Sequence, residues 1–219
     1  MSHPCLRGGQ LPKVVPIVEG DGEVSAVPAL LRKVLWQGMR YDIQIARPKN
    51  ANGRSNLTKA GGLERFVRYA WKEPDCGAIL VLVDAESDCP LDIARDFSSR
   101  ILAMGVLFPV VIVIANYMYE AWFLASLSTI AGHLDLPSGL EPPENPEAIR
   151  DPKAWIQRQF PPGRAYKETQ DQEAMTHLLD LNVARCARSF QRLLHAIDEA
   201  LEGIDAGTKN VTPVFINQD

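Results

Sequence analysis

Carboxylate side chains follow two apolar segments of this 219-residue chain, at the points where each segment ends. The segments span residues 13–18 and 77–83, and the acidic residues after them are Glu19, Glu23, Asp84, Glu86 and Asp88. In open α/β sheets, functional residues gather outside the carboxyl ends of the strands. The spacing therefore predicts that these five carboxylates meet at one edge of a sheet.

Carboxylates that converge without a cation repel one another, and some of them take up protons. A hard divalent cation removes this conflict, and Mg²⁺ is usually held by one or two carboxylates together with substrate phosphates. The five carboxylates therefore predict a site for Mg²⁺ or Mn²⁺ that serves phosphodiester hydrolysis. Taken singly, each acidic residue is also compatible with a solvated charge, and Asp88 before Pro90 is equally suited to cap the next helix.

A further acidic residue, Glu120, lies near the start of a helix predicted over residues 116–127. That helix follows a fourth apolar run at residues 106–115, so Glu120 is expected at the same edge of the sheet. Two interpretations remain open: Glu120 is an additional metal ligand, or it is a favourable negative charge at a helix start.

Basic residues predominate between Arg40 and Lys72, where the acidic residues are Asp42 and Glu64. This region is the best candidate for contact with a phosphate backbone. The residues predicted to make that contact are Arg47, Lys49, Arg54 and Lys59. The competing interpretation is a solvated loop followed by a solvated helix face.

Apolar runs of strand type alternate with segments of helical periodicity through the first 127 residues. The alternation predicts an α/β protein of Rossmann type, with a mostly parallel central sheet flanked by helices. Strands are expected at residues 13–18, 41–46, 77–83 and 106–115. The sequence divides into an α/β core at residues 1–130 and, at residues 131–219, a proline-rich connector with a C-terminal helical extension packed on the core.

Two prolines bear on the first strand and the first helix. Pro16 lacks the N–H that a central strand needs, which predicts a bulge or a weakly paired position. Pro28 lies in a helix predicted from about residue 23 to 36, and it is tolerated best within the first turn. Gly38 is expected to end that helix.

The composition excludes several classes of protein. The formal net charge is −4, so binding of a polyanion would depend on local clusters of basic residues. The four cysteines form no C-x-x-C pair, which argues against a zinc site or a disulfide framework. Residues 1–12 do not resemble a signal peptide, and the apolar run at 106–115 is too short for a membrane span. We expect a cytoplasmic protein without membrane association.

Two motifs resemble the Toprim fold, which topoisomerases, bacterial primases and the overcoming-lysogenization-defect nucleases share. They are Glu-Gly-x-x-Glu at residues 19–23 and Asp-x-Glu at residues 84–86. The resemblance implies an acid/base or metal role for Glu19 and Mg²⁺ binding by Asp84 and Glu86. Glu86 departs from the family pattern, which has Asp there. Mainly on the same resemblance, Lys167 is expected to stabilise the transition state.

The nearer resemblance is to small, stand-alone Toprim-like proteins of unknown function that are encoded beside AAA- or SMC-type ATPases in bacterial defence islands. It implies a Mg²⁺-dependent nuclease acting on DNA or RNA as the effector partner of such an ATPase in antiviral defence. The alternative is a non-catalytic subunit that docks to the ATPase. A phospho-acceptor domain is a third interpretation, disfavoured because no lysine directly follows the fourth strand. The sequence leaves a homo-oligomer open.

Overall fold

A computed structural model describes residues 10–213. Most of residues 1–12, which were predicted not to form a signal peptide, therefore lie outside the described part of the chain. Six parallel strands form one sheet in the order β2-β1-β4-β5-β6, with β3 also paired to β1. The strands are β1 (Lys13–Val18), β2 (Gln44–Ile45), β3 (Lys49–Asn50), β4 (Cys76–Asp84), β5 (Val110–Ala115) and β6 (Val211–Thr212). The predicted α/β fold with a parallel central sheet is therefore confirmed.

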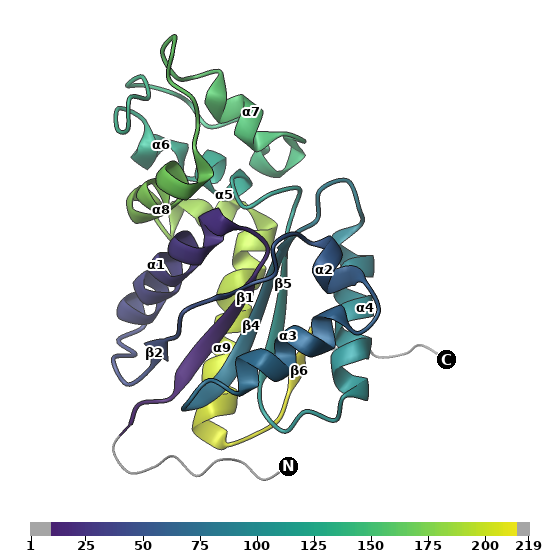
Figure 1. Cartoon of the computed structure of the whole chain (residues 1–219). Helices are drawn as coiled ribbons and strands as arrows, with labels where there is room; N and C mark the ends of the chain where they lie inside the picture. Colours follow the sequence, from purple (N-terminus) through teal and green to yellow (C-terminus); the bar gives the residue numbers. More distant parts are fainter. Residues whose placement is uncertain (1–9, 214–219) are drawn as a thin grey trace.

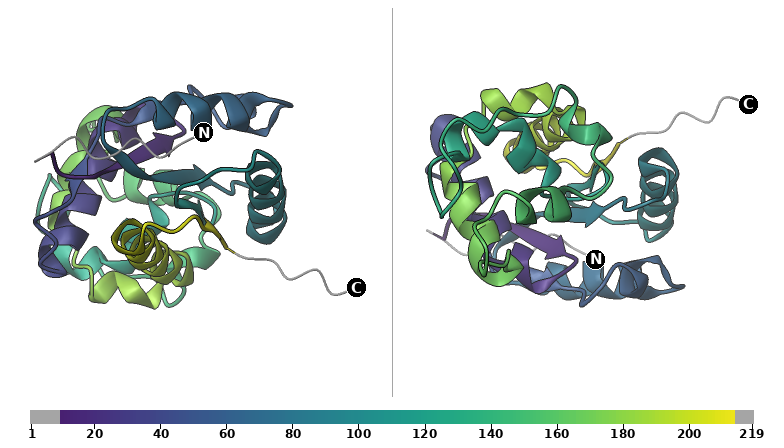
Figure 2. Two further views of the ribbon diagram at one scale, coloured as in Figure 1. Left: turned by 90° about the horizontal axis from the view of Figure 1, so that it is seen from below. Right: turned by 90° about the horizontal axis from the view of Figure 1, so that it is seen from above.

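Helices cover both faces of the sheet (Figures 1 and 2). One face is covered by α1 (Asp21–Gln37) and α9 (Arg188–Ala206), and the other by α3 (Gly62–Trp71) and α4 (Pro90–Ala103). This arrangement buries both faces of the central strands, which explains why β4 and β5 are continuous apolar runs. Within residues 10–213, no helix is long and apolar enough to cross a membrane.

The shorter helices lie beyond the carboxyl ends of the strands, at the top of Figure 1, or in the connections. The α-helices among them are α2 (Ser55–Thr58), α5 (Ala121–Ala125), α6 (Leu127–Ile130), α7 (Pro152–Gln157) and α8 (Glu173–Leu178). Single turns of other helix types are η1 (Pro146–Ala148), η2 (Glu168–Gln172) and η3 (Val183–Cys186). We call residues 127–178 the cap, because they lie over the end of the sheet that carries the acidic residues.

Pro16 lies at a gap in the hydrogen bonding of β1. On one side of β1, Lys13 and Val14 pair with β2, whereas Ile17 and Val18 pair with β3. The missing N–H of Pro16 falls between these two short pairings, so the predicted weakly paired position is confirmed. On the other side, Pro16 remains in register with β4, and the irregularity lies between Lys13 and Val14.

The first helix begins earlier than its periodicity predicted, and the expectation for Pro28 was wrong. Because α1 begins at Asp21, Pro28 lies in its interior rather than in its first turn. Pro28 and most of its apolar neighbours are buried, so packing on the sheet compensates for the lost backbone hydrogen bond. Gly38 caps the carboxyl end of α1, as predicted.

The segment after β5 is less helical than predicted. A helix was expected over residues 116–127, but only α5 at Ala121–Ala125 forms there. Tyr117 adopts a positive φ of 57°, which is incompatible with a helix beginning at residue 116.

The last described residues belong to the layers of the sheet. Helix α9 packs against β4 and β5, and β6 pairs with β5, Val110 lying opposite Val211. The division at residue 130 stays a prediction, but part of the C-terminal region contributes a strand to the central sheet.

Candidate active site at the carboxyl ends of β1 and β4

The strand order places a topological switch point between β1 and β4. From β1 the chain continues to β2 and β3 on one side, whereas β4, β5 and β6 extend to the other side. Helices α1 and α4, which follow β1 and β4, therefore cover opposite faces and leave a crevice between the two strand ends. Glu19 directly follows β1 and Asp84 ends β4. The backbone N–H of Asp84 donates a hydrogen bond of 3.0 Å to Oε2 of Glu19.

An open pocket of about 310 Å³ lies at this crevice. Its lining consists of Glu19, Gly20, Asp21, Glu23, Asn52, Gly53, Asp84, Glu86, Met118, Lys153 and Glu168. Four of the predicted metal or catalytic residues are thus brought together, namely Glu19, Glu23, Asp84 and Glu86. The other three, Asp88, Glu120 and Lys167, do not line the pocket. We call this feature the acidic pocket.

Asp84 and Glu23 are the most buried carboxylates that line the pocket, each with an exposed fraction of 8%. Oδ1 of Asp84 accepts a 2.9 Å hydrogen bond from the backbone N–H of Tyr119, which fixes the side chain. Burial raises the pKa of Asp84 well above its ordinary value, and the charges of Glu120, Glu23 and Glu19 raise it further. A negative charge here is costly, so the side chain favours a proton or a cation.

Glu19 and Glu23 share this environment. Burial raises the pKa of Glu19, and the neighbouring charges of Glu23 and Glu86 add to the effect. Glu23 lies in the first turn of α1, where its Oε2 accepts a 2.7 Å hydrogen bond from the backbone N–H of Gly20. Burial also raises the pKa of Glu23. Each of the three buried carboxylates therefore holds its proton more tightly than it would in water.

Glu120 lies beneath the acidic pocket and is completely buried. Its Oε1 accepts hydrogen bonds from the hydroxyl of Tyr166 at 2.9 Å and from the side-chain amide of Gln172 at 3.2 Å. Its Oε2 has no hydrogen-bond partner among residues 10–213. Burial raises the pKa of Glu120 to about 7, even though Lys153 opposes the shift. Glu120 thus binds cap residues and does not face the pocket.

Lys153 is the cationic residue of the pocket that the sequence did not single out, and the acidic lining residues Asp21 and Glu168 were not singled out either. Nζ of Lys153 lies 2.9 Å from Glu168 and 4.0 Å from Glu120. Burial lowers its pKa, but Glu120 and Glu168 outweigh that effect, so Lys153 is a cation in the acidic pocket. The local signal is Asp151-Pro152, which marks the start of α7, where the Asp151 carboxylate accepts a 2.8 Å hydrogen bond from Ala154 N–H. This signal places Lys153 in a helix but does not place it in the pocket.

Lys167, which was predicted for this role, is exposed and lies outside the lining of the pocket. Its backbone N–H donates a 2.6 Å hydrogen bond to the carboxylate of Asp171. In the structure, the lysine that lines the acidic pocket is Lys153, whereas the sequence predicted Lys167 at this position.

Arg54 contacts and positions the loop at residues 84–88, which carries the second acidic motif. Its guanidinium donates hydrogen bonds to the backbone carbonyls of Asp84 at 3.2 Å and Ala85 at 2.7 Å. It also forms ion pairs with Asp88 and, at 3.4 Å, with Glu86. Because these contacts leave only 15% of its side chain exposed, Arg54 positions the loop rather than presenting a free charge.

The other basic residues predicted to bind nucleic acid lie in different environments. Lys49 forms a 2.6 Å ion pair with Glu73, and only 11% of its side chain is exposed. Arg47 and Lys59 are exposed, and Nζ of Lys59 donates a hydrogen bond to Asn56. The four predicted residues therefore do not present four free cations.

The donor set of the acidic pocket fits a divalent metal in its chemistry. Carboxylate oxygens are the ligands that Mg²⁺ prefers, and one or two are enough when substrate phosphates complete the shell. Across residues 10–213, no group of three or more His, Cys, Asp or Glu residues lies close enough together to hold a metal ion. The predicted cluster is thus a shared pocket and not a compact set of ligands.

The parallel sheet and the acidic pocket at its switch point place this chain among α/β proteins whose sites lie at the strand ends. The chain belongs to the family named DUF4276, a domain of unknown function, whose model matches residues 18–198. No curated protein matches it.

One solved structure, the C-terminal region of the Burkholderia pseudomallei OLD protein, is similar at 17% identity and a TM-score of 0.43. The match covers 87% of this chain and 98% of that chain. At this level the similarity does not determine the fold, which follows from the chain's own strand order.

Proposed function

We propose that this protein is a nuclease that hydrolyses phosphodiester bonds with Mg²⁺ or Mn²⁺ held at the acidic pocket. One observation carries the proposal: carboxylates from the ends of adjacent parallel strands line an open pocket that also contains a lysine cation, Lys153. Carboxylates with raised pKa values favour a bound cation, and an ammonium group favours a phosphate. The sequence resemblance to the Toprim fold supports the same reaction.

Five residues of the acidic pocket have assigned roles in this proposal. Asp84 and Glu86 would hold the metal, with Glu23 nearby. When bound, the metal supplies charge neutralisation and Lewis-acid activation of the phosphate. Glu19, whose pKa is raised by burial, takes the proton of the attacking water, because a base with a pKa closer to neutrality transfers protons efficiently. Lys153 binds a phosphate oxygen and stabilises the charge that develops on it.

The test is calorimetric titration with Mn²⁺ and Mg²⁺, followed by incubation with fluorescent DNA and RNA. The wild type is compared with an Asp84→Asn, Glu86→Gln double variant. The matched control is Glu202→Gln, which removes an exposed carboxylate on α9. We expect metal-dependent cleavage by the wild type and the control and none by the double variant. Equal cleavage by the wild type and the double variant would overturn the proposal.

A non-catalytic docking subunit is the second candidate. It is favoured by the lack of a compact three-ligand group in residues 10–213 and by exposed apolar side chains in the last turn of α1 and in the loop that follows it. Those side chains are Trp36, Met39 and Tyr41, with exposed fractions of 63%, 75% and 68%. In this case an ATPase of the AAA or SMC type, implied by the sequence resemblance, would bind at the apolar patch. Wild-type protein that neither binds metal nor cleaves nucleic acid would favour this function.

The partner and the biological role also rest on the sequence resemblance. In the nuclease proposal, the ATPase would present the nucleic acid to the acidic pocket, and the pair would act in antiviral defence.

A further inference from the structure

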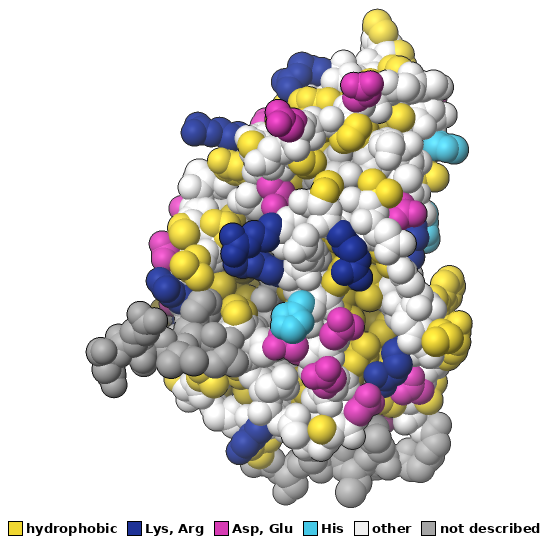
Figure 3. Space-filling view, turned by 180° about the vertical axis from the view of Figure 1, so that it is seen from behind, with side chains coloured by type: hydrophobic (Ala, Val, Ile, Leu, Met, Phe, Trp, Pro, Cys, Tyr) yellow, Lys and Arg dark blue, Asp and Glu magenta, His cyan; other side chains and the backbone are white. Residues whose placement is uncertain are grey.

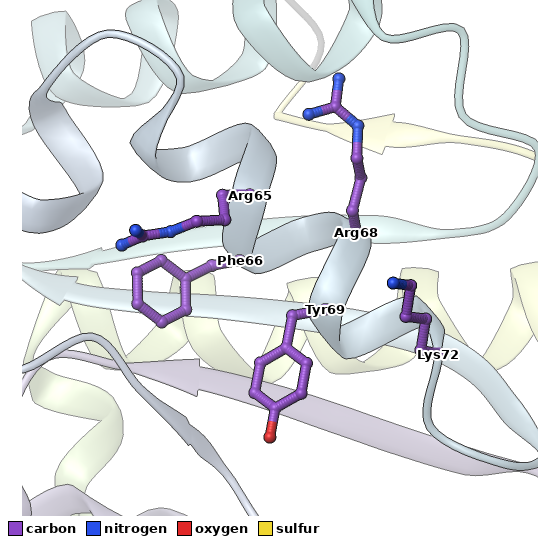
Figure 4. A pocket seen from close by; sticks show the side chains of 5 residues that line it. All are labelled: Arg65, Phe66, Arg68, Tyr69 and Lys72. Atoms are coloured by element: carbon purple, nitrogen blue, oxygen red, sulfur yellow. The ribbon is translucent and has the colours of Figure 1, made fainter.

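A second pocket lies on the outer face of α3, away from the acidic pocket. It is a groove of about 480 Å³ whose lining is Arg65, Phe66, Arg68, Tyr69 and Lys72. We call it the α3 groove. Figure 4 shows that Phe66 and Tyr69 point to the same side of the helix, with Arg65 beside Phe66, whereas Arg68 extends away from the two rings. The groove thus combines aromatic rings with cations on one short helix.

The cations of the α3 groove are exposed, although Arg100 and, after it, the charge of Arg68 lower the pKa of the neighbouring Glu64. Among residues 10–213, none of Arg65, Arg68 and Lys72 forms a salt bridge, and all three are exposed. Arg54 and Arg100, by contrast, are held by carboxylates in the same half of the molecule. Exposed cations along one face attract a polyanion, because binding releases counterions from the phosphates.

The aromatic rings add a different attraction. Tyr69 has an exposed fraction of 56%, so part of its ring is accessible to a ligand. The guanidinium of Arg65 lies 5.1 Å from the ring centroid of Phe66. Unpaired bases stack on such rings and guanidinium groups, whereas the bases of a duplex already stack on one another.

The α3 groove is connected to the acidic pocket through β3. Nζ of Lys49 lies 4.8 Å from the ring centroid of Tyr69, at the groove. The next residue, Asn50, donates a 2.7 Å hydrogen bond to Asp21, which lines the acidic pocket. A strand of nucleic acid that lies in the groove and follows β3 would therefore reach the pocket.

The side of the molecule behind the view of Figure 1 has a different distribution of charge. Figure 3 shows that positive and negative side chains are interspersed there, with histidines and hydrophobic side chains between them. The concentration of cations and rings on α3 is therefore a local feature that the net charge of −4 conceals.

We propose that the α3 groove binds single-stranded nucleic acid and guides it along β3 to the acidic pocket. This inference deepens the proposed nuclease function and rests on it for the fate of the bound strand. Arg65 and Lys72 contact phosphates, and Tyr69 stacks on a base.

Fluorescence anisotropy with labelled 20-nucleotide oligo-dT and oligo-U tests the proposal in the presence of EDTA, so that cleavage plays no part. We expect Arg65→Ala with Lys72→Ala to weaken binding and to reduce the slope of log K against log salt by about 1.4, roughly 0.7 for each lost phosphate contact. Tyr69→Ala should weaken binding roughly tenfold, and Tyr69→Phe should restore it, because both rings stack. Circular dichroism checks that each variant is folded.

A matched control removes the same charge elsewhere. Arg185→Ala with Arg192→Ala changes two exposed cations at η3 and α9, on the other side of the sheet, and should leave binding unchanged. Equal weakening by both double variants would overturn the proposal, because it would indicate general charge attraction. Tighter binding of a labelled 20-base-pair DNA duplex than of the single strands in the same assay, or no binding of oligonucleotides by the wild type at low salt, would overturn it as well.

The two proposals fail separately. Asp84→Asn with Glu86→Gln should abolish cleavage and leave binding in EDTA intact, whereas the α3 variants should lose binding. Binding at the groove without any cleavage by the wild type would contradict the nuclease function alone.

Discussion

The acidic pocket and the α3 groove both concentrate charge of one sign, but they do so in opposite environments. In the pocket, Asp84 is 8% exposed and burial raises its pKa. In the groove, Arg65 and Lys72 are exposed and free of salt bridges to the rest of residues 10–213. Buried like charges need a proton or a cation to become stable, whereas exposed cations are already stabilised by water and salt. Changes of charge in the acidic pocket are therefore expected to alter the free energy of unfolding, whereas changes of charge in the α3 groove are not.

The largest expected effect concerns the single cation among the pocket-lining residues. Lys153→Ala should reduce the rate of nucleic acid cleavage by roughly 100- to 1000-fold, as removal of one group that stabilises transition-state charge typically does. Single-turnover kinetics in Mn²⁺ would measure the effect. Lys153→Arg should retain more activity than Lys153→Ala, and Lys167→Ala should stay close to wild type. Loss of activity in Lys167→Ala with retention in Lys153→Ala would show that the sequence prediction was right and the pocket assignment wrong.

The next effect is a pH dependence of stability that arises at Glu120. Its pKa rises from an ordinary value of 4.5 to about 7 in the folded protein. The folded state therefore binds this proton more tightly than the unfolded chain does. The free energy of unfolding should consequently fall as the pH rises from about 5 to 8, by at most about 3 kcal/mol from this group.

Urea denaturation at pH 5.5 and pH 8 would measure this dependence. Glu120→Gln should flatten it, because the amide cannot ionise and its carbonyl oxygen can still accept from Tyr166. Glu202→Gln should keep the wild-type dependence. An unchanged pH dependence in Glu120→Gln would mean that another carboxylate is responsible.

A smaller effect is expected when one carboxylate of the pocket loses its charge. Asp84→Asn should stabilise the metal-free protein at pH 8 by about 1 kcal/mol, which corresponds to roughly 2–4 °C in Tm for a chain of this size. The amide oxygen of the new side chain can still accept the hydrogen bond from Tyr119 N–H. Addition of Mn²⁺ should raise the Tm of the wild type but not of the variant, as differential scanning fluorimetry can show. A lower Tm for metal-free Asp84→Asn would contradict the comparison.

The smallest effect should appear at the α3 groove. Arg65→Ala with Lys72→Ala should change the free energy of unfolding by less than about 0.5 kcal/mol for each residue, because both side chains are exposed and make no ion pair with residues 10–213. The same urea denaturation measures it. A stability change as large as that of a pocket variant would remove the contrast between the two regions.

Sequence reasoning could place Glu19 and Asp84 together because both follow parallel strands, whose carboxyl ends lie at one edge. Because β1 and β4 are adjacent, the side chain of Glu19 accepts a hydrogen bond from the backbone N–H of Asp84. Local patterns suffice for such a pair, because each residue is positioned by the strand that precedes it.

The position of Lys153 could not be predicted in the same way. It reaches the pocket because α7 lies in the cap over the strand ends, and that placement depends on packing between segments far apart in the sequence. The intramolecular contacts of Arg54 could not be predicted for a related reason. Its partners lie at residues 84–88 and become visible only when the β4–α4 loop is folded against it.

The pairing of β5 with β6 has a consequence for synthesis of the chain. Val110 pairs with Val211, so this edge of the central sheet is completed only after all residues between the two strands have been synthesised. Until then, β5 is paired with β4 but lacks β6 and the covering helix α9, and its apolar face is open to other nascent chains. Contacts between residues so distant in sequence also slow folding. Chaperones that shield exposed strand edges should therefore bind this protein during the interval of translation in which strands β1 to β5 have emerged and β6 has not.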